Sequence, residues 1–286
     1  MEGKQLEIDF TANETLEAEI EKHQNLYQQG RAVISDSEYD AMVKRLEAVK
    51  PDADVLSRIG AAEGEVEHVT PMLSLQKAYT FADVECWWAC DTAGLDDDIM
   101  VSFKLDGIAC SLVYEGGKLV LASTRGDGLK GMDITRYVTA SRYIPQTVPT
   151  AERIEIRGEL VIAFADYAKH NVKKGRTSVA SAMRGKVKPI CEVLRFVAYD
   201  AVDALDEGAK FANLGVLGFE VALHTMVSWN AVERALEAFT DARSSYAYDC
   251  DGIVLKLAKK AHQVALGCTR HHPRAAIAYK FGCESF

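Results

Sequence analysis

Residues 99–124 read IMVSFKLDGIACSLVYEGGKLVLAST, and this stretch decides the class of fold. Apolar side chains recur with a period of two in Ile99–Phe103, Ile108–Tyr114 and Lys118–Thr124, which is typical of strands. Glu115-Gly116-Gly117 stands between the last two segments and predicts a hairpin turn. The stretch therefore predicts three strands, the last two of them antiparallel.

The rest of the chain after residue 70 mixes strands with helices in no regular order. Further strands are predicted at Arg153–Ile162, Arg195–Val202, Gly252–Leu257 and Ala276–Phe281. Helical patterns lie around Phe81–Ala93, Phe164–Val172, Ala209–Leu217 and Trp229–Thr240. This irregular order favours an α+β fold over a doubly wound α/β sheet.

The first 50 residues have helical periodicity instead. Apolar and aromatic positions recur at Leu16, Ile20, His23 and Tyr27, and again at Tyr39, Met42, Val43 and Leu46. Ser35 or Asp36 can cap the second helix, and Glu38 would complete a capping box with Ser35. Glycines and Pro71 follow, so we expect a small helical domain over residues 1–70 and a second domain over residues 71–286.

The net charge of −9 argues at first against a nucleic-acid partner, because DNA binding depends on cationic contacts to phosphate. The charge is unevenly placed, however. Residues 1–70 hold seven Lys and Arg against sixteen Asp and Glu, so the remainder is neutral. Lys169–Lys188 and Lys256–Lys280 contain no acid. These basic strips are either solvated surface or two surfaces that face phosphates.

Seven cysteines at irregular spacing favour reduced thiols in a cytoplasm, and no apolar run is long enough to span a membrane. Cys86 and Cys90 are one helical turn apart, but no second Cys or His pair nearby completes a zinc set. We therefore expect no zinc site and no membrane contact.

Lys104 follows the first predicted strand, within Lys104-Leu105-Asp106-Gly107. It is either a strand-end lysine that reaches solvent or an amine nucleophile kept partly neutral by its surroundings. An ordered set of groups follows it and raises the second possibility. The set comprises Arg125-Gly126-Asp127-Gly128, Arg157-Gly158-Glu159, Tyr199, Asp251-Gly252-Ile253-Val254-Leu255-Lys256 and Ala278-Tyr279-Lys280-Phe281.

This order resembles the motifs of covalent nucleotidyltransferases, the superfamily of DNA ligases, RNA ligases and capping enzymes, and specifically those of NAD-dependent bacterial-type DNA ligases. The resemblance implies a DNA-ligase/ATP-grasp-like nucleotidyltransferase domain with antiparallel sheets after residue 70. Lys104 would be the adenylated nucleophile. The implied catalytic set is Lys104, Asp106, Asp251, Lys256 and Lys280, with the last two on the AMP phosphate.

The resemblance also assigns the nucleotide contacts. Tyr199 would stack on adenine with Val254 on the opposite face, and Arg125 would contact the nucleotide or nicked DNA. Glu159 would bind ribose or, together with Asp251, a Mg²⁺ ion.

The N-terminal domain resembles the helical domain that binds the nicotinamide mononucleotide (NMN) half of NAD in this family. The matching positions are Tyr27, Asp36, Tyr39 and Asp40. The last three share one helix face, where acids suit a cationic nicotinamide ring. Without the other motifs, Tyr39 would read as a core residue. Thr70-Pro71-Met72-Leu73-Ser74-Leu75 resembles the junction between the two domains, with Ser74 and Leu75 at the cofactor.

Arg176 and Arg184 are spaced like two family arginines that contact DNA or nucleotide, and Arg274 lies in a loop of the second basic strip. Some positions depart from the family pattern, most clearly Gln28 for a His and Ser102 for a Glu. Met132 also replaces an acid, and Gly282 replaces a Pro. These departures favour a divergent, phage-encoded member, working in a bacterial cytoplasm or an infected host cell.

The resemblance covers residues 16 to 282 and includes no OB-fold, zinc, helix-hairpin-helix or BRCT domain. It implies an adenylation unit for DNA repair or replication, with NAD, Mg²⁺ and nicked double-stranded DNA as its ligands. The chain would be a fragment, a minimal protein, or one subunit whose partner carries the OB-fold. An ATP-dependent ligase or capping-type enzyme, and a non-catalytic subunit of a split ligase, are the alternatives.

Overall fold

The chain divides into two compact units, Met1–Ala61 and Ala62–Phe286. The computed structural model describes residues 10–28, 33–50, 53, 55, 66–92, 95–184, 188–202 and 205–282. None of the helices within these ranges is long and apolar enough to cross a membrane.

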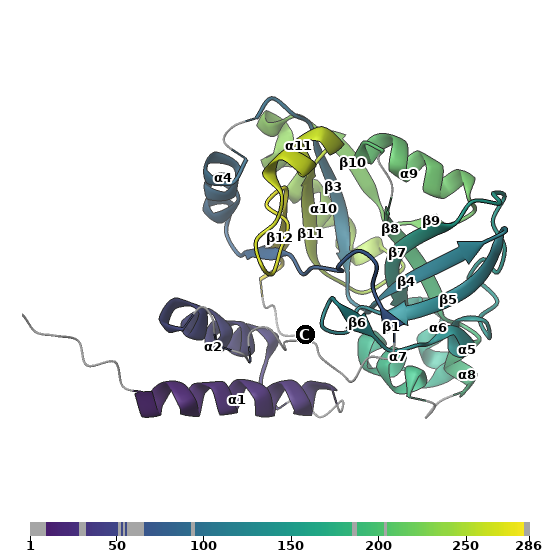
Figure 1. Cartoon of the computed structure of the whole chain (residues 1–286), viewed down its shortest axis with the longest axis horizontal. Coiled ribbons are helices and arrows are strands. Elements are labelled where there is room, and N and C mark those ends of the chain that lie inside the picture. Colours follow the sequence, from purple (N-terminus) through teal and green to yellow (C-terminus); the bar gives the residue numbers. More distant parts are fainter. Residues whose placement is uncertain are drawn as a thin grey trace, which may run out of the picture. The chain divides into compact units, whose positions relative to one another are not determined.

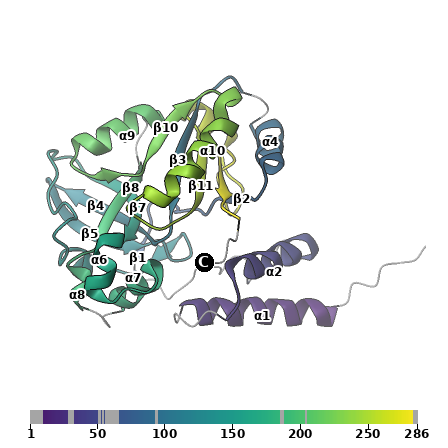
Figure 2. The same cartoon turned by 180° about the vertical axis from the view of Figure 1, so that it is seen from behind.

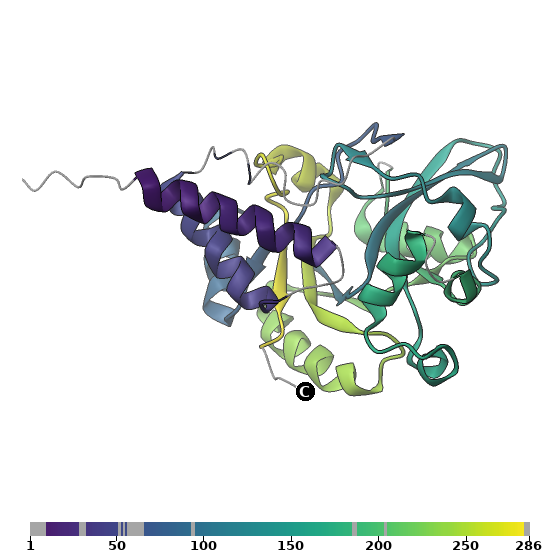
Figure 3. The ribbon, with the colours of Figure 1, turned by 90° about the horizontal axis from the view of Figure 1, so that it is seen from below.

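The first unit is a pair of helices, α1 (Phe10–Gln28) and α2 (Asp36–Val49), which lie side by side (Figure 3). Leu16 and Ile20 of α1 and Leu46 of α2 are buried between them. Ser35 caps α2: its hydroxyl accepts a hydrogen bond from the Glu38 amide at 3.2 Å, and the Glu38 carboxylate accepts one from the Ser35 amide at 2.8 Å. The predicted capping box is therefore confirmed.

The second unit is built on two five-stranded sheets (Figure 1). The first sheet has the order β10 (His224–Val227), β3 (Ile99–Leu105), β11 (Cys250–Leu257), β12 (Ala276–Lys280), β2 (Gln76–Ala78). The second sheet has the order β5 (Lys118–Thr124), β4 (Ile108–Glu115), β7 (Ile154–Val161), β8 (Arg195–Ala201), β9 (Glu220–Val221). All neighbours are antiparallel except β12–β2 and β8–β9, so the predicted α+β class is confirmed.

The predicted hairpin joins β4 to β5. Glu115 pairs with Lys118 across a two-residue turn, and Gly116 and Gly117 have φ angles of 57° and 76°. A turn of this type needs positive φ at both central residues, which glycine adopts without strain. The two glycines thus fix the register of the strands that follow the Lys104 segment.

Helices bury the outer face of each sheet. On the first sheet, α10 (Val232–Ala242) packs against β3, α4 (Phe81–Cys90) packs against β12 and β2, and in Figure 2 α10 lies in front of the sheet. On the second sheet, α7 (Gly175–Met183) and α9 (Glu207–Val216) contribute to the largest core. The other helical segments are α5 (Thr135–Val138), α6 (Phe164–His170), α8 (Lys188–Cys191), α11 (Lys260–Leu266), η1 (Trp229–Ala231) and η2 (Arg243–Ser245).

A smaller apolar cluster joins the two sheets. Leu105 of β3 packs there with Val161 of β7, Val197 of β8 and Tyr248, all at most 3% exposed. At this cluster the end of β3 packs against β7 and β8 of the second sheet. The inner face of the first sheet carries Lys104 at the end of β3.

The segment before β2 belongs to the second unit. A short ribbon pairs β1 (Val66–Glu67) with β6 (Lys130–Gly131). The buried Arg157 side chain donates hydrogen bonds to the carbonyl oxygens of Thr70 and Pro71, at 2.5 and 3.0 Å. Residues 66–70, which the sequence assigns to the N-terminal domain, are therefore held by the second unit.

Candidate active site

Lys104 faces inward because of strand alternation. Ile99, Val101 and Phe103 point into the outer core beneath α10, so Lys104 lies on the opposite face of β3. In the ladder, Lys104 pairs with Gly252 of β11, and Gly252 pairs in turn with Lys280 of β12. Directly paired residues share a face, so the two lysines project from the same side of the sheet, one strand apart.

Asp251 reaches these lysines through a β-bulge. Cys250 pairs with Leu105 and Gly252 with Lys104, which leaves Asp251 as the extra residue of β11. Its carboxylate lies 3.2 Å from Lys104 Nζ and 2.5 Å from Lys280 Nζ. Burial works against ionisation, but Lys104 and Lys280 outweigh it and hold the pKa of Asp251 below its ordinary value. The structure therefore brings together three of the predicted catalytic residues.

Gly107 lets the Lys104 segment lie against the second sheet. A Cβ atom at this position would stand 2.2 Å from the Leu160 carbonyl oxygen and 2.8 Å from Glu159 Cγ. No other residue type fits without displacing β7. The glycine of the Lys104–Gly107 motif thus has a steric role that the sequence pattern alone does not reveal.

Glu159 is a buried carboxyl group on β7, with 9% of its surface exposed. Burial raises its pKa to about 7, although Lys104, Arg176 and Arg125 act in the opposite direction. Lys104, Arg176 and Arg125 are therefore close enough to Glu159 to act on its charge.

Asp106 and Arg176 form an ion pair at 3.3 Å. Burial raises the pKa of Asp106, Arg176 opposes the shift, and the nearby Asp251 carboxylate adds to it. Arg176, on the first turn of α7, is therefore directed at the same site as Lys104.

A second bulge turns Tyr199 toward the site. On β8, Asp200 pairs with Arg157 and Ala198 with Gly158, so Tyr199 is the extra residue. Burial and then the Glu159 carboxylate raise the pKa of the Tyr199 hydroxyl. Val254 lies on the inner face of β11, paired with Ser102 of β3. The two predicted adenine contacts thus come from different sheets.

Lys256 shares the inner face but has other partners. Its Nζ lies 2.9 Å from a carboxylate oxygen of Glu207, the first residue of α9. It lies 3.5 Å from a carboxylate oxygen of Asp200, in β8 of the second sheet. Lys210 of α9 pairs with the same two carboxylates. Sequence reasoning missed Asp200, Glu207 and Lys210, because no local spacing indicates that they meet Lys256.

The other two predicted DNA contacts, Arg184 and Arg274, have partners outside the Lys104 site. Arg184 is exposed at the end of α7, where its Nε donates to the Ala180 carbonyl oxygen at 3.2 Å. The Arg274 guanidinium pairs with Asp91 at 3.2 Å.

The predicted domain junction, residues 70–75, is hydrogen-bonded to the second basic strip. The Ser74 amide and hydroxyl both donate to the His271 carbonyl oxygen, at 3.1 and 3.2 Å. The next residue, Leu75, is half-buried.

In the first unit, the predicted NMN contacts are only partly described. Tyr39 and Asp40 are half-buried on α2. Burial, reinforced by Asp40, raises the pKa of Tyr39 to about 12, and its hydroxyl is buried with no hydrogen-bond partner among the residues that the structure describes. The side chains of Tyr27 and Asp36 lie outside the described part of the structure.

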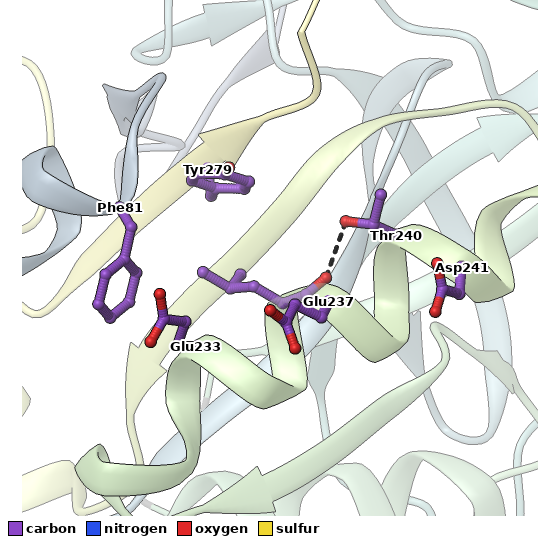
Figure 4. A pocket seen from close by; sticks show the side chains of 7 residues that line it. Phe81, Glu233, Glu237, Thr240, Asp241 and Tyr279 are labelled. Atoms are coloured by element: carbon purple, nitrogen blue, oxygen red, sulfur yellow. Dashed lines mark hydrogen bonds between the residues drawn. The ribbon is translucent and has the colours of Figure 1, made fainter.

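A separate groove lies on the outer face of the first sheet (Figure 4). It has a volume of about 310 Å³ and runs along α10, with Phe81 and Tyr279 opposite the helix. Glu233, Glu237 and Asp241 face it from α10. None of the predicted site residues lines this groove, so it is distinct from the site around Lys104.

The carboxylates near Lys104 supply only some of the ligands that a metal ion needs. Within the described ranges, no three His, Cys, Asp or Glu side chains are grouped to hold a metal ion unaided. Glu159 and Asp251 can supply two oxygen ligands, and Mg²⁺ is commonly held by one or two carboxylates plus substrate phosphates. The donor chemistry therefore fits Mg²⁺ that arrives with a phosphate ligand.

Two lysines that both form ion pairs with one bulged aspartate, between two largely antiparallel sheets, fit a nucleotidyltransferase-type domain. The chain belongs to the family of NAD-dependent DNA ligase adenylation domains, whose sequence profile matches residues 61–284.

Curated relatives agree with this assignment. A DNA ligase from Wolbachia pipientis subsp. Culex pipiens is 35% identical over 288 residues, covering 94% of this chain and 44% of the relative. DNA ligase 1 from Nocardia farcinica is 34% identical, covering 90% of this chain and 42% of the relative. The chain thus spans less than half the length of these relatives. Among solved structures, an archaeal ATP-dependent RNA ligase is similar with a TM-score of 0.46 and 13% identity, over 77% of this chain and 50% of that one.

Proposed function

We propose that this chain carries out the adenylation step of NAD-dependent DNA ligation. Lys104 Nζ, as the neutral amine, attacks the α-phosphorus of NAD: an N–P bond forms, the P–O bond to NMN breaks, and one amine proton is released to solvent. The product is AMP joined to Lys104 as a phosphoramidate. The observation that carries this proposal is the grouping of Lys104, Asp251 and Lys280 on one sheet face, in a chain whose family is defined by adenylation.

Asp251 is proposed to orient the nucleophile. Its carboxylate contacts both lysine amines, and its lowered pKa makes it a poor proton acceptor. Its role is therefore to fix the Lys104 amine and to keep Lys280 beside it. Lys280 is then placed to offset negative charge on the phosphate oxygens in the transition state.

Bound Mg²⁺, held by Glu159 and Asp251 together with phosphate oxygens, would supply further charge stabilisation. Glu159 alternatively binds the ribose, and its buried carboxyl group suits either contact. Tyr199 and Val254 would enclose the adenine ring, and Arg125 would contact the nucleotide. Asp106 would hold Arg176 toward the same phosphates through their ion pair.

The first unit is proposed to bind the NMN half of NAD through Tyr27, Asp36, Tyr39 and Asp40. The buried, unpartnered hydroxyl of Tyr39 supports this role, because buried polar groups normally have a hydrogen-bond partner and a ligand would supply one. Ser74 and Leu75, next to the second basic strip, are proposed to contact the cofactor as well.

Nicked double-stranded DNA is the proposed second substrate. AMP would move from Lys104 to a 5′-phosphate at the nick, and the 3′-hydroxyl would then displace it. Arg184 and Arg274, with Arg176, are the proposed DNA contacts. A second subunit carrying an OB-fold is a candidate partner, and the cytoplasm of a bacterium or of a phage-infected cell is the expected compartment.

The test is a covalent labelling experiment. The chain is incubated with Mg²⁺ and NAD, ATP or GTP labelled in the α-phosphate, and the protein-bound label is measured after denaturation. We expect label from NAD alone and none in Lys104→Ala. Label from ATP or GTP in place of NAD would favour an ATP-dependent ligase or a capping-type enzyme, and no label from any donor would favour a non-catalytic subunit.

A further inference from the structure

A closed ring of four charges lies at the far end of the inner face from Lys104. Lys210 contacts Asp200 at 2.6 Å and Glu207 at 2.9 Å, and Lys256 contacts the same residues at 3.5 and 2.9 Å. Each lysine therefore bridges both carboxylates. We call Asp200, Glu207, Lys210 and Lys256 the Lys256 ring.

The ring joins the two sheets. Lys256 belongs to β11 of the first sheet, Asp200 to β8 of the second sheet, and Glu207 to the start of α9. The Glu207 amide donates to the Ala258 carbonyl oxygen at 2.9 Å, which fixes the start of α9 at the end of β11. The acids are thus held beside Lys256 by the backbone as well as by charge.

Burial differs sharply within the ring. The side chains of Lys210 and Glu207 are each 1% exposed, whereas 21% of Lys256 and 28% of Asp200 is exposed. Glu207 uses only one of its oxygens: Oε1 accepts from Lys210 and Gln263, while Oε2 is buried without a partner. Lys210 is consequently the inner cation, and Lys256 is the cation that a ligand can reach.

The two positive charges of the ring balance its two negative charges. This balance matters because Asp200 and Glu207 compete with any bound anion for Lys256. Although burial disfavours the ammonium form, the two carboxylates hold the pKa of Lys210 above its ordinary value, so Lys210 stays charged. Without that inner charge the ring would carry a net charge of −1, and Lys256 would be the single cation shared by two carboxylates.

We infer that Lys210, Asp200 and Glu207 are positioning residues that set how far Lys256 is available to the nucleotide phosphate. This inference rests on the proposed function of Lys256 at the AMP phosphate. Lys210 neutralises the two acids from inside, which lets Lys256 turn to the phosphate. The acids in turn hold the Lys256 stem on the inner face.

The first test removes and then restores charge balance in the full chain. Lys210→Met deletes the inner charge but keeps most of the buried stem. We expect it to raise the NAD concentration for half-maximal adenylation about tenfold, because Asp200 and Glu207 then compete with the phosphate for Lys256 as the single cation of the ring. The second-site change Glu207→Gln in Lys210→Met should return that concentration to within about twofold of wild type.

A control separates charge from loss of stability. Ile144→Val trims a buried side chain in the outer core of the second sheet, where it is 3% exposed, and alters no charge. It should lower the melting temperature without changing the NAD concentration for half-maximal adenylation. An unchanged concentration in Lys210→Met, or no recovery in the double variant, would overturn the inference while leaving the proposed function in place.

A second measurement does not depend on NAD. The protein is acetylated with an N-hydroxysuccinimide ester, and the labelling rate of Lys256 is compared with that of the exposed Lys118 by peptide mass spectrometry. Acylation needs a neutral amine, so Lys256 should react about tenfold more slowly in Lys210→Met and recover in the double variant. Equal ratios in all three proteins would refute the coupling, even if wild type takes no AMP from NAD.

Discussion

Replacing Gly107 with alanine tests whether the site depends on the close approach of the Lys104 segment to β7. The added Cβ would stand 2.2 Å from the Leu160 carbonyl oxygen, and it must move 0.8 Å to reach the 3.0 Å that real Cβ atoms respect. The added Cβ would also lie 2.8 Å from Glu159 Cγ and 2.8 Å from Val161 Cγ1, so a small shift along β7 would not relieve the clash. Either β3 or β7 must shift.

The size of the effect follows from that displacement. A misplacement of about 1 Å at a reacting group can cost on the order of 100-fold in rate. Overpacking of a buried site typically costs about 1–3 kcal/mol of unfolding free energy. We therefore expect Gly107→Ala to fold, to melt several degrees lower, and to lose about 100-fold in the single-turnover rate of AMP transfer from NAD.

The assay is the rate of adduct formation at saturating NAD, measured below the melting temperature of each variant. Gly215→Ala is the matched control, because a Cβ at Gly215 in α9 meets nothing within 4 Å. It should keep the wild-type rate and gain up to about 1 kcal/mol in unfolding free energy. A folded Gly107→Ala protein that is adenylated at the wild-type rate would refute the reasoning.

Three further predictions follow from the same geometry. Asp251→Asn removes the charge that holds Lys104 and Lys280 together and should slow adduct formation at least about 100-fold with little loss of helical circular dichroism; a rate within tenfold of wild type would contradict this role. Removing Met1–Ala61 should abolish reaction with NAD yet spare sealing of pre-adenylated nicked DNA, if the chain seals nicks; a truncated chain that reacts equally well with NAD would exclude an NMN role for the first unit. Asp200 has a pKa held below its ordinary value because Lys256 and Lys210 outweigh the effect of burial, so it contributes stability above about pH 4 that is lost as the pH falls further. Asp200→Asn should thus be less stable than wild type at pH 7, and in denaturant titrations the difference should shrink toward pH 2; a difference that does not change with pH would rule out this charge effect.

Local pattern was enough to find most of the strands. Lys118–Thr124 was predicted at the residues where β5 lies, and β4, β7 and β8 were within a residue or two of their bounds. These strands have seven or eight residues each, long enough for their apolar pattern to be visible in the sequence. The strand β10 (His224–Val227) was missed, because four half-exposed residues form a strand only when β3 is beside them.

The geometry of the site was harder to predict from the sequence. The motifs named Lys104, Asp251, Lys280 and Tyr199, but the bulges that turn Asp251 and Tyr199 toward the site depend on how neighbouring strands pair. Such pairing is a long-range property that no local spacing encodes. The Lys256 ring was missed for the same reason, since Lys256 is 46 residues or more from each of its partners in the sequence.

The central claim is that Lys104 takes AMP from NAD, and intact-mass spectrometry of the full chain tests it most directly. After incubation with NAD and Mg²⁺, the wild-type protein should gain the mass of one AMP, and peptide mapping should place the adduct on Lys104. Lys104→Ala should gain nothing under the same conditions. A wild-type chain that remains unmodified, or an AMP adduct that persists in Lys104→Ala, would contradict the account.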